Sequence, residues 1–357
     1  MGVQILIGDA VARLKGLPDQ SVNCCVTSPP YYGLRDYGMP GQIGLEETPG
    51  AFIARLVDVF REVRRVLRDD GTLWVNLGDS YASKPNGSIG RSTLDGTQSG
   101  QAEYRRTNAR RKSRLPGGLK HKDLMGMPWR LAFALQDDGW YLRQDIIWAK
   151  PNPMPESVRD RCTKSHEYMF LLTKKPRYYF DRGAISEPVA PASVARLAQD
   201  IENQAGSDRV VGKSNGRMKA VTRSKRDSFK REDSKRCVAH PGQTMGTHRP
   251  DRDDGQWDIA KRNKRSVWNV ATIGFKEAHF ATFPLALIEP CILAGCPVGG
   301  VVLDPFGGAG TTGLVAGHHG RDAILCELNP EYAALSARRI KHELRLFADV
   351  DVSAEAA

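Results

Sequence analysis

The pattern of hydrophobic and polar positions along this chain predicts strands and helices that follow one another in turn. Over 51–67, apolar residues recur every three or four positions and form one stripe, which indicates an amphipathic helix that Gly71 ends. Helices are predicted at about 10–15, 51–67, 128–139, 285–293, 311–316 and 330–346, and strands at about 4–8, 22–26, 72–78, 142–148, 167–173, 301–306 and 323–328. This alternation predicts an α/β fold with a mainly parallel sheet and helices on both faces.

Two polar segments interrupt this alternation and carry most of the positive charge. Residues 82–122 contain ten Lys and Arg against two acids, and 187–265 contain eighteen against eleven. The rest of the 357-residue chain is therefore slightly acidic, although the net charge is +11. Solvated, partly disordered loops are one explanation. The concentration of charge favours the other, contact with nucleic-acid phosphates. The candidate DNA-binding residues are Arg105, Arg106, Arg110, Arg111, Lys112, Arg223, Lys225 and Arg226.

The cysteine pattern and the absence of long apolar runs bear on the cellular compartment. Seven cysteines without paired Cys-x-x-Cys spacing indicate reduced thiols and predict neither a disulfide framework nor a metal site. Cys291 lies in an apolar helical stretch and is predicted to be a buried core thiol. No apolar run approaches the roughly 18 residues that span a bilayer, and no signal peptide is visible. These features predict a cytoplasmic protein that is not bound to a membrane.

The stretch 27–38 follows a predicted buried strand and has an unusual composition for a loop. Pro29 and Pro30 end the strand, because neither can donate to a ladder and each fixes its own φ. Ser28 before them and Tyr31 after them place a hydroxyl, exposed carbonyls and an aromatic ring at a stiff strand end. An edge strand closed by a proline turn is one interpretation, and a platform for a flat polar ligand is the other.

A second motif, Gly308-x-Gly310-x-x-Gly313, lies between a predicted strand and a predicted helix. Glycines let a ligand approach the backbone, and the helix N-terminus offers N–H groups to an anion. No lysine follows the last glycine, which argues against a phosphate-binding ATPase loop. Glu327 ends the next predicted strand, where an acid suits the two hydroxyls of a ribose. The motif and the acid predict an adenosine-containing cofactor, with a purely structural turn as the alternative.

Together the two motifs resemble those of the DNA amino-methyltransferases. The run from Asp304 to Thr312 is similar to their S-adenosylmethionine-binding loop, and the run from Thr27 to Tyr31 is similar to their catalytic motif. The catalytic motif comes first, which resembles the beta-type order. The resemblance implies a Rossmann-like methyltransferase fold, S-adenosyl-L-methionine as cofactor and double-stranded DNA as partner. It implies catalytic roles for Ser28, Pro29, Pro30 and Tyr31, and cofactor contacts by Asp9, Ala10, Phe283, Pro284, Asp304, Phe306, Gly308, Gly310, Thr311 and Glu327.

The resemblance also suggests how the chain is divided, since it covers about 4–186 and 266–345. Trp148, Lys150, Asn152 and 166–168 resemble family segments that line the base pocket. The predicted parts are a catalytic half at 1–186 with the basic loop 82–122, a target-recognition insert at 187–265, a cofactor-binding half at 266–347 and a tail at 348–357. The sequence leaves open whether the protein is a homodimer and whether a cognate restriction endonuclease accompanies it.

The implied reaction moves a methyl group to the exocyclic amine of a base flipped out of DNA. The Ser28 side chain and the Pro29 carbonyl are expected to accept the protons of the amine, and Tyr31 to stack on the base. A Ser-Pro-Pro-Tyr motif favours cytosine N4 slightly over adenine N6. The alternatives are a non-catalytic DNA-binding protein with this fold and a nicotinamide-dependent dehydrogenase. Asp79, after the strand predicted at 72–78, is expected to cap a loop.

Overall fold

The structure is a computed structural model that describes residues 2–82, 118–191, 261–272, 282–345 and 349–354. The chain divides into two compact units, one formed by Met1–Ile185 with Arg265–Ala357 and the other by Ser186–Lys264. The first unit contains the large sheet and the helices that pack on it.

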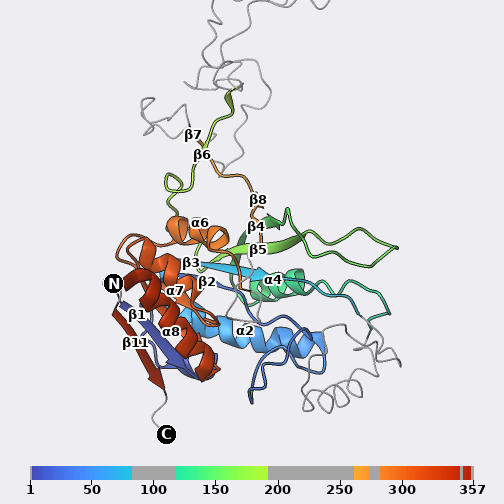
Figure 1. Ribbon diagram of the computed structural model, residues 1–357, viewed down its shortest axis with the longest axis horizontal. Helices are drawn as coiled ribbons and strands as arrows, with labels where there is room; N and C mark the ends of the chain where they lie inside the picture. Colours follow the sequence, from blue (N-terminus) through green and yellow to red (C-terminus); the bar gives the residue numbers. More distant parts are fainter. Residues whose placement is uncertain (1, 83–117, 192–260, 273–281, 346–348, 355–357) are drawn as a thin grey trace, which may run out of the picture. The chain divides into compact units, whose positions relative to one another are not determined.

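In the described part of the first unit, nine strands form one sheet in the order β11-β1-β10-β9-β2-β3-β5-β4-β8 (Figure 1). Neighbouring strands are parallel except at β5, which is antiparallel to both β3 and β4. The prediction of a mainly parallel sheet is therefore confirmed. The strands are β1 (Gly2–Ile7), β2 (Val22–Thr27), β3 (Leu67–Leu77), β4 (Tyr141–Ala149), β5 (His166–Thr173), β8 (Val267–Asn269), β9 (Val301–Asp304), β10 (Asp322–Glu327) and β11 (Asp349–Ala354).

Helices cover both faces of this sheet, as predicted (Figure 1). One hydrophobic cluster joins α1, α2 and α4 to the sheet and includes Phe60 and Leu131. The second cluster joins α6, α7 and α8 to the opposite face and includes Ile288, Val315 and Ile340. The helices are α1 (Ala10–Lys15), α2 (Pro49–Val66), α4 (Met127–Asp137), α6 (Leu285–Gly295), α7 (Thr311–His318) and α8 (Pro330–Leu344). Because both faces are covered, the central strand β2 can be a nearly continuous buried run.

The junction between α2 and β3 differs from the predicted one. The apolar stripe continues through Leu67, and Gly71 was expected to end the helix, but α2 ends at Val66 and β3 begins at once. Leu67 is fully buried and pairs with Val22 of the neighbouring strand. Leu67 fits the helical periodicity, but it belongs to the strand because it pairs with Val22 in the sheet.

The segment predicted to be a tail, 348–357, contains a strand instead. β11 pairs in parallel with β1, so that Val350 lies opposite Val3 and Val352 opposite Ile5. Val350 is buried, and the aspartates on either side of it are exposed. The alternation of apolar and acidic residues suits an edge strand with one face on the core.

In the second unit, the structure describes only the ends. β6 (Glu187–Pro188) and β7 (Lys261–Arg262) form an antiparallel pair, and Glu187 lies 3.5 Å from Arg262 and 3.8 Å from Lys264. The predicted DNA-binding residues Arg105, Arg106, Arg110, Arg111, Lys112, Arg223, Lys225 and Arg226 lie outside the described residues. Their contact with DNA stays a prediction.

Two further predictions concern the cysteines and membrane segments. Cys291 is fully buried in α6, where its thiol contacts the carbonyl of Leu287, which confirms its place in the core. The six cysteines in the described ranges are free thiols, of which Cys162 alone is exposed. Within those ranges, every helix is too short or too polar to cross a membrane.

Candidate functional site

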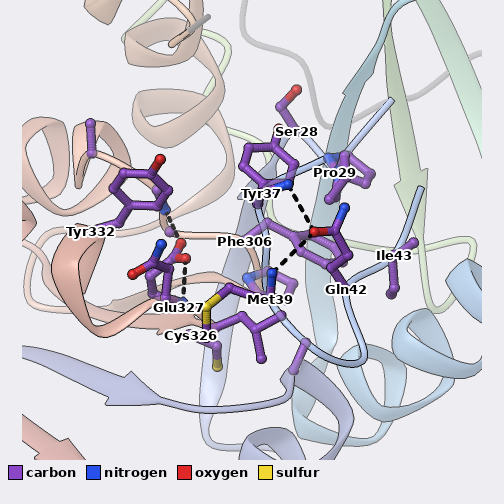
Figure 2. A pocket seen from close by; sticks show the side chains of 18 of the residues that line it. Ser28, Pro29, Tyr37, Met39, Gln42, Ile43, Phe306, Cys326, Glu327 and Tyr332 are labelled. Atoms are coloured by element: carbon purple, nitrogen blue, oxygen red, sulfur yellow. Dashed lines mark hydrogen bonds between the residues drawn. The ribbon is translucent and has the colours of Figure 1, made fainter. Parts of the chain in front are cut away.

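A cavity opens where β1, β2, β9 and β10 end, at the carboxyl edge of the sheet (Figure 2). In open α/β sheets, ligands bind at this edge, between loops that leave neighbouring strands. The cavity brings together eleven of the fourteen residues predicted to be catalytic or to hold the cofactor: Asp9, Ala10, Ser28, Pro29, Pro30, Tyr31, Phe283, Phe306, Gly308, Thr311 and Glu327.

Glu327 is held at the end of β10 by two backbone amides. Its Oε2 accepts a hydrogen bond of 2.7 Å from Gly308 N, and its Oε1 accepts one of 2.9 Å from Asn329 N. Burial raises the pKa of Glu327 above the usual glutamate value, while these amide bonds act in the opposite direction. Each carboxylate oxygen keeps a further lone pair for a hydroxyl in the cavity.

The wall around Glu327 is mainly apolar and aromatic. Figure 2 shows the side chains of Tyr37, Phe306 and Tyr332 around this part of the cavity. Arg35 is the only cation among the lining residues that the structure describes. Flat rings, an acid and a glycine-rich turn fit a nucleoside, whereas a chain of phosphates would call for more cations. The residues present therefore fit an adenosine-containing cofactor.

Asp304 was predicted to contact the cofactor, but it lies beneath the wall of the cavity. Its side chain is buried and accepts hydrogen bonds from Thr27 Oγ1 and Thr312 Oγ1, both at 2.6 Å, and from Phe306 N at 3.0 Å. Burial raises the pKa of this carboxyl, and the hydrogen bonds oppose that shift. Asp304 thus joins β2, the glycine turn and α7, and it supports the residues that line the cavity.

Gly310 and Pro284 also lie outside the wall, for reasons of packing. Gly310 is the N-cap of α7 with φ of 75°, and a Cβ built on it would lie 2.1 Å from Ser336 Oγ of α8. Only glycine allows both this conformation and this close approach. Pro284 is the N-cap of α6, while Phe283 before it lines the cavity. Asp9 lines the cavity and also caps α1, by accepting from Ala12 N at 3.0 Å.

Beside the cavity, a polar cluster joins the Ser-Pro-Pro-Tyr turn to β3, β4 and β5. Tyr31 donates its hydroxyl to Glu167 Oε2 at 2.7 Å, and Lys150 Nζ lies 2.5 Å from Glu167 Oε1. Asn76 accepts from Ser28 Oγ at 3.4 Å and from the Tyr31 hydroxyl at 3.3 Å, and it donates to Glu167 at 3.3 Å. Burial, followed by the charge of Glu167, raises the pKa of Tyr31, so this phenol stays protonated and donates.

Gly78, the first residue after β3, leaves the space that the Tyr31 ring occupies. A Cβ built on Gly78 would lie 2.4 Å from Cε2 and 3.0 Å from Cδ2 of that ring. Gly78 therefore makes room for the ring, while Glu167 and Asn76 hold its hydroxyl. The ring edge thus packs close to Gly78, and its hydroxyl is held by hydrogen bonds.

Asp79 has the capping role that the sequence predicts. Its carboxylate accepts from Gly126 N at 3.1 Å and Met127 N at 3.0 Å, at the start of α4. The α4 N-cap, Gly126, has no side chain to do this. Lys164 Nζ donates to the Asp79 carbonyl at 3.1 Å, and burial lowers the pKa of Lys164.

Sequence reasoning missed several residues of the site. Tyr37, Met39, Gln42 and Ile43 line the cavity from the loop that follows β2 (Figure 2). Gln42 fixes that loop by accepting from Tyr37 N at 2.8 Å. Tyr332 lies in the first turn of α8, which begins three residues after Glu327. The sequence offered one signal: Tyr37 and Tyr332 are aromatic residues close in the chain to the predicted site residues Tyr31 and Glu327.

Comparison with known proteins adds an independent finding. A profile of the DNA methylase family N6_N4_Mtase matches residues 22–338. The Type II methyltransferase M.Cfr9I of Citrobacter freundii is 43% identical over 342 residues, which cover 96% of this chain and 89% of the relative. The match therefore spans nearly the whole chain.

Two solved structures resemble the fold. TTHA0409 of Thermus thermophilus, assigned as a DNA modification methylase and complexed with S-adenosyl-L-methionine, has a TM-score of 0.53 and 23% identity, with coverage of 98% of this chain and 99% of that one. The cytosine-N4-specific PvuII DNA methyltransferase has a TM-score of 0.54 and 16% identity, with coverage of 98% and 96%. At these identities, the likeness concerns the fold alone.

Proposed function

This chain belongs to the N6/N4 family of DNA methylases, and on that premise we propose that its target is the N4 amine of cytosine. Members of this family use S-adenosyl-L-methionine to methylate an exocyclic amino group in DNA, so the chain is a DNA methyltransferase. The dehydrogenase alternative therefore has no support. The observation that carries the choice of cytosine is Ser28 at the head of the Pro-Pro-Tyr turn, at the cavity wall.

In this proposal, the cavity holds the cofactor through its nucleoside. Glu327 accepts the ribose hydroxyls, and Phe306 and Tyr37 contact the adenine ring. Asp9 and Ala10 contribute the wall after β1, and Phe283 the wall before α6. When bound, S-adenosyl-L-methionine supplies an electrophilic methyl group on a sulfonium. Because the walls are mainly apolar, the residues of the Ser-Pro-Pro-Tyr turn are the ones proposed to orient the amine that receives the methyl group.

Ser28 and Pro29 are proposed to activate the amine by accepting hydrogen bonds from its two N–H groups. The lone pair of an exocyclic amine is conjugated with its ring, so the amine is a poor nucleophile until it is bent toward tetrahedral geometry. Ser28 donates its own proton toward Asn76, which leaves its oxygen lone pairs for the amine. The Pro29 carbonyl offers a second acceptor, since no ladder occupies the strand end. Both groups act by position and electrostatics.

Tyr31 is proposed to stack on a base that has left the duplex. A base within the helix cannot reach a pocket at a strand edge, so it has to be flipped out. Stacking on an aromatic side chain stabilises such a base by about 1–3 kcal/mol. The bonds from Tyr31 to Glu167 and Asn76 prevent the ring from rotating away.

Replacing Gly78 by alanine tests this fixed ring. The added methyl group would lie 2.4 Å from Tyr31, so the ring has to move. We expect the methyl-transfer rate on DNA to fall by about tenfold or more, because a misplaced positioning group is costly. Binding of S-adenosyl-L-methionine, measured by calorimetry, should change less than the rate, because the proposed nucleoside contacts Glu327, Phe306 and Tyr37 are not altered.

Gly50 provides the matched control, because a Cβ there would meet Thr48 Oγ1 only at 4.0 Å. Gly50→Ala should keep the wild-type rate. Equal rates for the Gly78→Ala and unsubstituted enzymes would remove the role assigned to the Tyr31 ring.

Sequencing of modified bases tests the proposed target. The protein is expressed in a host without its own DNA methylation, and each methylated position in the genome is read with its context. We expect N4-methylcytosine at one recurring sequence. N6-methyladenine at a recurring sequence would correct the base while keeping the reaction, and unmodified DNA would overturn both.

Of three further points about the cellular setting, the cytoplasmic location stays a prediction, and the sequence leaves the homodimer and the restriction endonuclease open. The Type II relative supports the proposal that a restriction endonuclease of the same specificity accompanies this enzyme. The measurement is whether DNA from cells that express the protein is protected from cleavage by that endonuclease. A homodimer predicts twice the monomer mass in sedimentation equilibrium, and a cytoplasmic location predicts recovery in the soluble fraction of lysed cells.

A further inference from the structure

The loop between β4 and β5 presents the large apolar side chain of Met154 to solvent. Met154 is 85% exposed, the highest value among the large hydrophobic residues of the described ranges. Pro153 and Pro155 flank it on either side. Each proline fixes its own φ and restricts the residue before it, so the tip of the loop is stiff. Holding a methionine in water at a stiff tip stabilises nothing in the free protein.

Polar contacts anchor the loop on both sides of this tip. Before it, Asn152 Nδ2 donates to the Thr272 carbonyl at 3.0 Å, and Thr272 N donates to Asn152 Oδ1 at 2.9 Å. After it, the Arg161 guanidinium bonds both oxygens of Glu156 at 2.7 and 3.2 Å and lies 4.0 Å from the centre of the Tyr81 ring. The anchors fix the ends of the tip and leave Met154 uncovered.

The loop starts and ends beside the catalytic turn. Lys150 N donates to the Ser165 carbonyl at 2.8 Å, which closes the base of the loop. Lys150 Nζ binds Glu167, and Glu167 binds Tyr31. Met154 lies four residues after Lys150, within about 14 Å along an extended chain. It therefore extends from the edge of the sheet at which the flipped base has to enter.

The surroundings of the tip suit DNA. Arg159 is exposed on the same loop, where the acids Glu156 and Asp160 are paired with Arg161 and Lys122. An exposed cation beside an apolar tip fits a partner whose surface is anionic and whose interior is apolar and stacked. Proteins that deform DNA insert Met, Leu, Ile, Phe or Pro side chains between base steps in this way.

From these observations, and resting on the proposed function, we propose that Met154 is a wedge that enters the base stack of duplex DNA where the target base has left it. The thioether side chain fills the space between the neighbouring base pairs and delays the return of the base. The flanking prolines keep the wedge from folding back. Met154 is thus a positioning residue, separate from the groups that contact the amine.

The test compares two DNA duplexes once the methylated site has been mapped. In one the target base is paired, and in the other it faces an abasic position, so that less energy is needed to flip it. Initial methyl-transfer rates are measured with full-length wild-type, Met154→Ala and Met154→Leu enzymes. We expect Met154→Ala to be about tenfold slower than wild type on the paired duplex and within about twofold on the abasic duplex. Met154→Leu should keep most of the rate on both.

Val298→Ala is the matched control. Val298 is 76% exposed but precedes β9, at the opposite edge of the sheet, so this variant should match wild type on both duplexes. A Met154→Ala rate equal to wild type on paired DNA would overturn the wedge, and so would an equal loss on both duplexes. If the mapping found no methylated site, or the wild-type enzyme transferred no methyl group to either duplex, the proposed function would fail, and the wedge with it.

Discussion

Replacing Ser28 by alanine is expected to lower kcat for DNA methylation by about 10² to 10³-fold, which is the loss seen when one preorganised group at a reacting centre is removed. Ser28 lines the cavity at the end of β2, and its hydroxyl points its proton toward Asn76. Alanine leaves the fold and the Pro29 carbonyl in place but removes one acceptor for the amine. The measurement is the single-turnover rate with labelled S-adenosyl-L-methionine and saturating DNA.

The pattern of the loss matters as much as its size. Cofactor affinity should stay within about twofold, because Ser28 is proposed to contact the acceptor base. Ser21→Ala is the control, since Ser21 lies in an exposed turn and bonds only the Pro18 carbonyl in the described structure. A Ser28→Ala enzyme with an unchanged rate, or with a rate lowered only through weaker cofactor binding, would contradict the role given to this hydroxyl.

Replacing Glu327 by alanine is expected to weaken the binding of S-adenosyl-L-methionine by about 100-fold or more. Hydrogen bonds to a charged group contribute about 1.5–3 kcal/mol each, and two ribose hydroxyls are proposed to meet this carboxylate. Alanine also removes the acceptor that holds Gly308 N at 2.7 Å, so the glycine turn loses its anchor. Calorimetric titration with the cofactor gives the affinity. Glu331→Ala, on the exposed side of the same region, should bind normally.

The raised pKa of Glu327 adds a pH dependence with a definite sign. As pH falls through this raised pKa, the carboxylate gains a proton and cofactor affinity should decrease, already above the usual glutamate range. Stability of the free protein changes in the other direction. A raised folded-state pKa contributes stability below the unfolded value that is lost as pH rises through the folded value. Glu327→Gln should remove the first effect and lessen the second, with Asp304 still contributing to it.

The local motifs of the site could be predicted from the sequence, because each lies at the end of its own strand. Ser28 and Pro29 follow β2, Gly308 follows β9, and Glu327 ends β10. The carboxyl ends of parallel strands meet at one edge, so a parallel sheet brings these residues together without further information. The fold and the cavity follow from the same rule.

The polar cluster beside the cavity could not be predicted, because it depends on non-local pairing. Asn76 lies within the apolar run of β3 and reads as part of a buried strand. It meets Glu167 because β5 inserts antiparallel between β3 and β4, with Asn76 opposite Met169. Hydrophobic periodicity predicts where helices and strands lie in the sequence, but it does not predict which strands are neighbours in the sheet. The resemblance named the segment 166–168 but gave no partner for it.

Asp304 shows the limit of a motif. The sequence places it in the glycine-rich run. Only the packing shows that it lies behind the lining residues, bonded to Thr27 and Thr312, and is not itself part of the lining. β11 was missed for a related reason, since its short alternating pattern gains meaning only from β1 beside it. Both positions depend on contacts between residues that are far apart in the chain, Thr27 with Asp304 and β1 with β11.

The most direct test of the central claim is to identify the nucleoside that receives the methyl group. Wild-type enzyme is incubated with unmethylated DNA and S-adenosyl-L-methionine carrying a deuterated methyl group, and the digested nucleosides are separated and weighed by mass spectrometry. We predict a trideuteromethyl group on N4 of deoxycytidine, nearly absent with Ser28→Ala. Label on C5 of cytosine, on N6 of adenine or on no nucleoside at all would contradict this prediction.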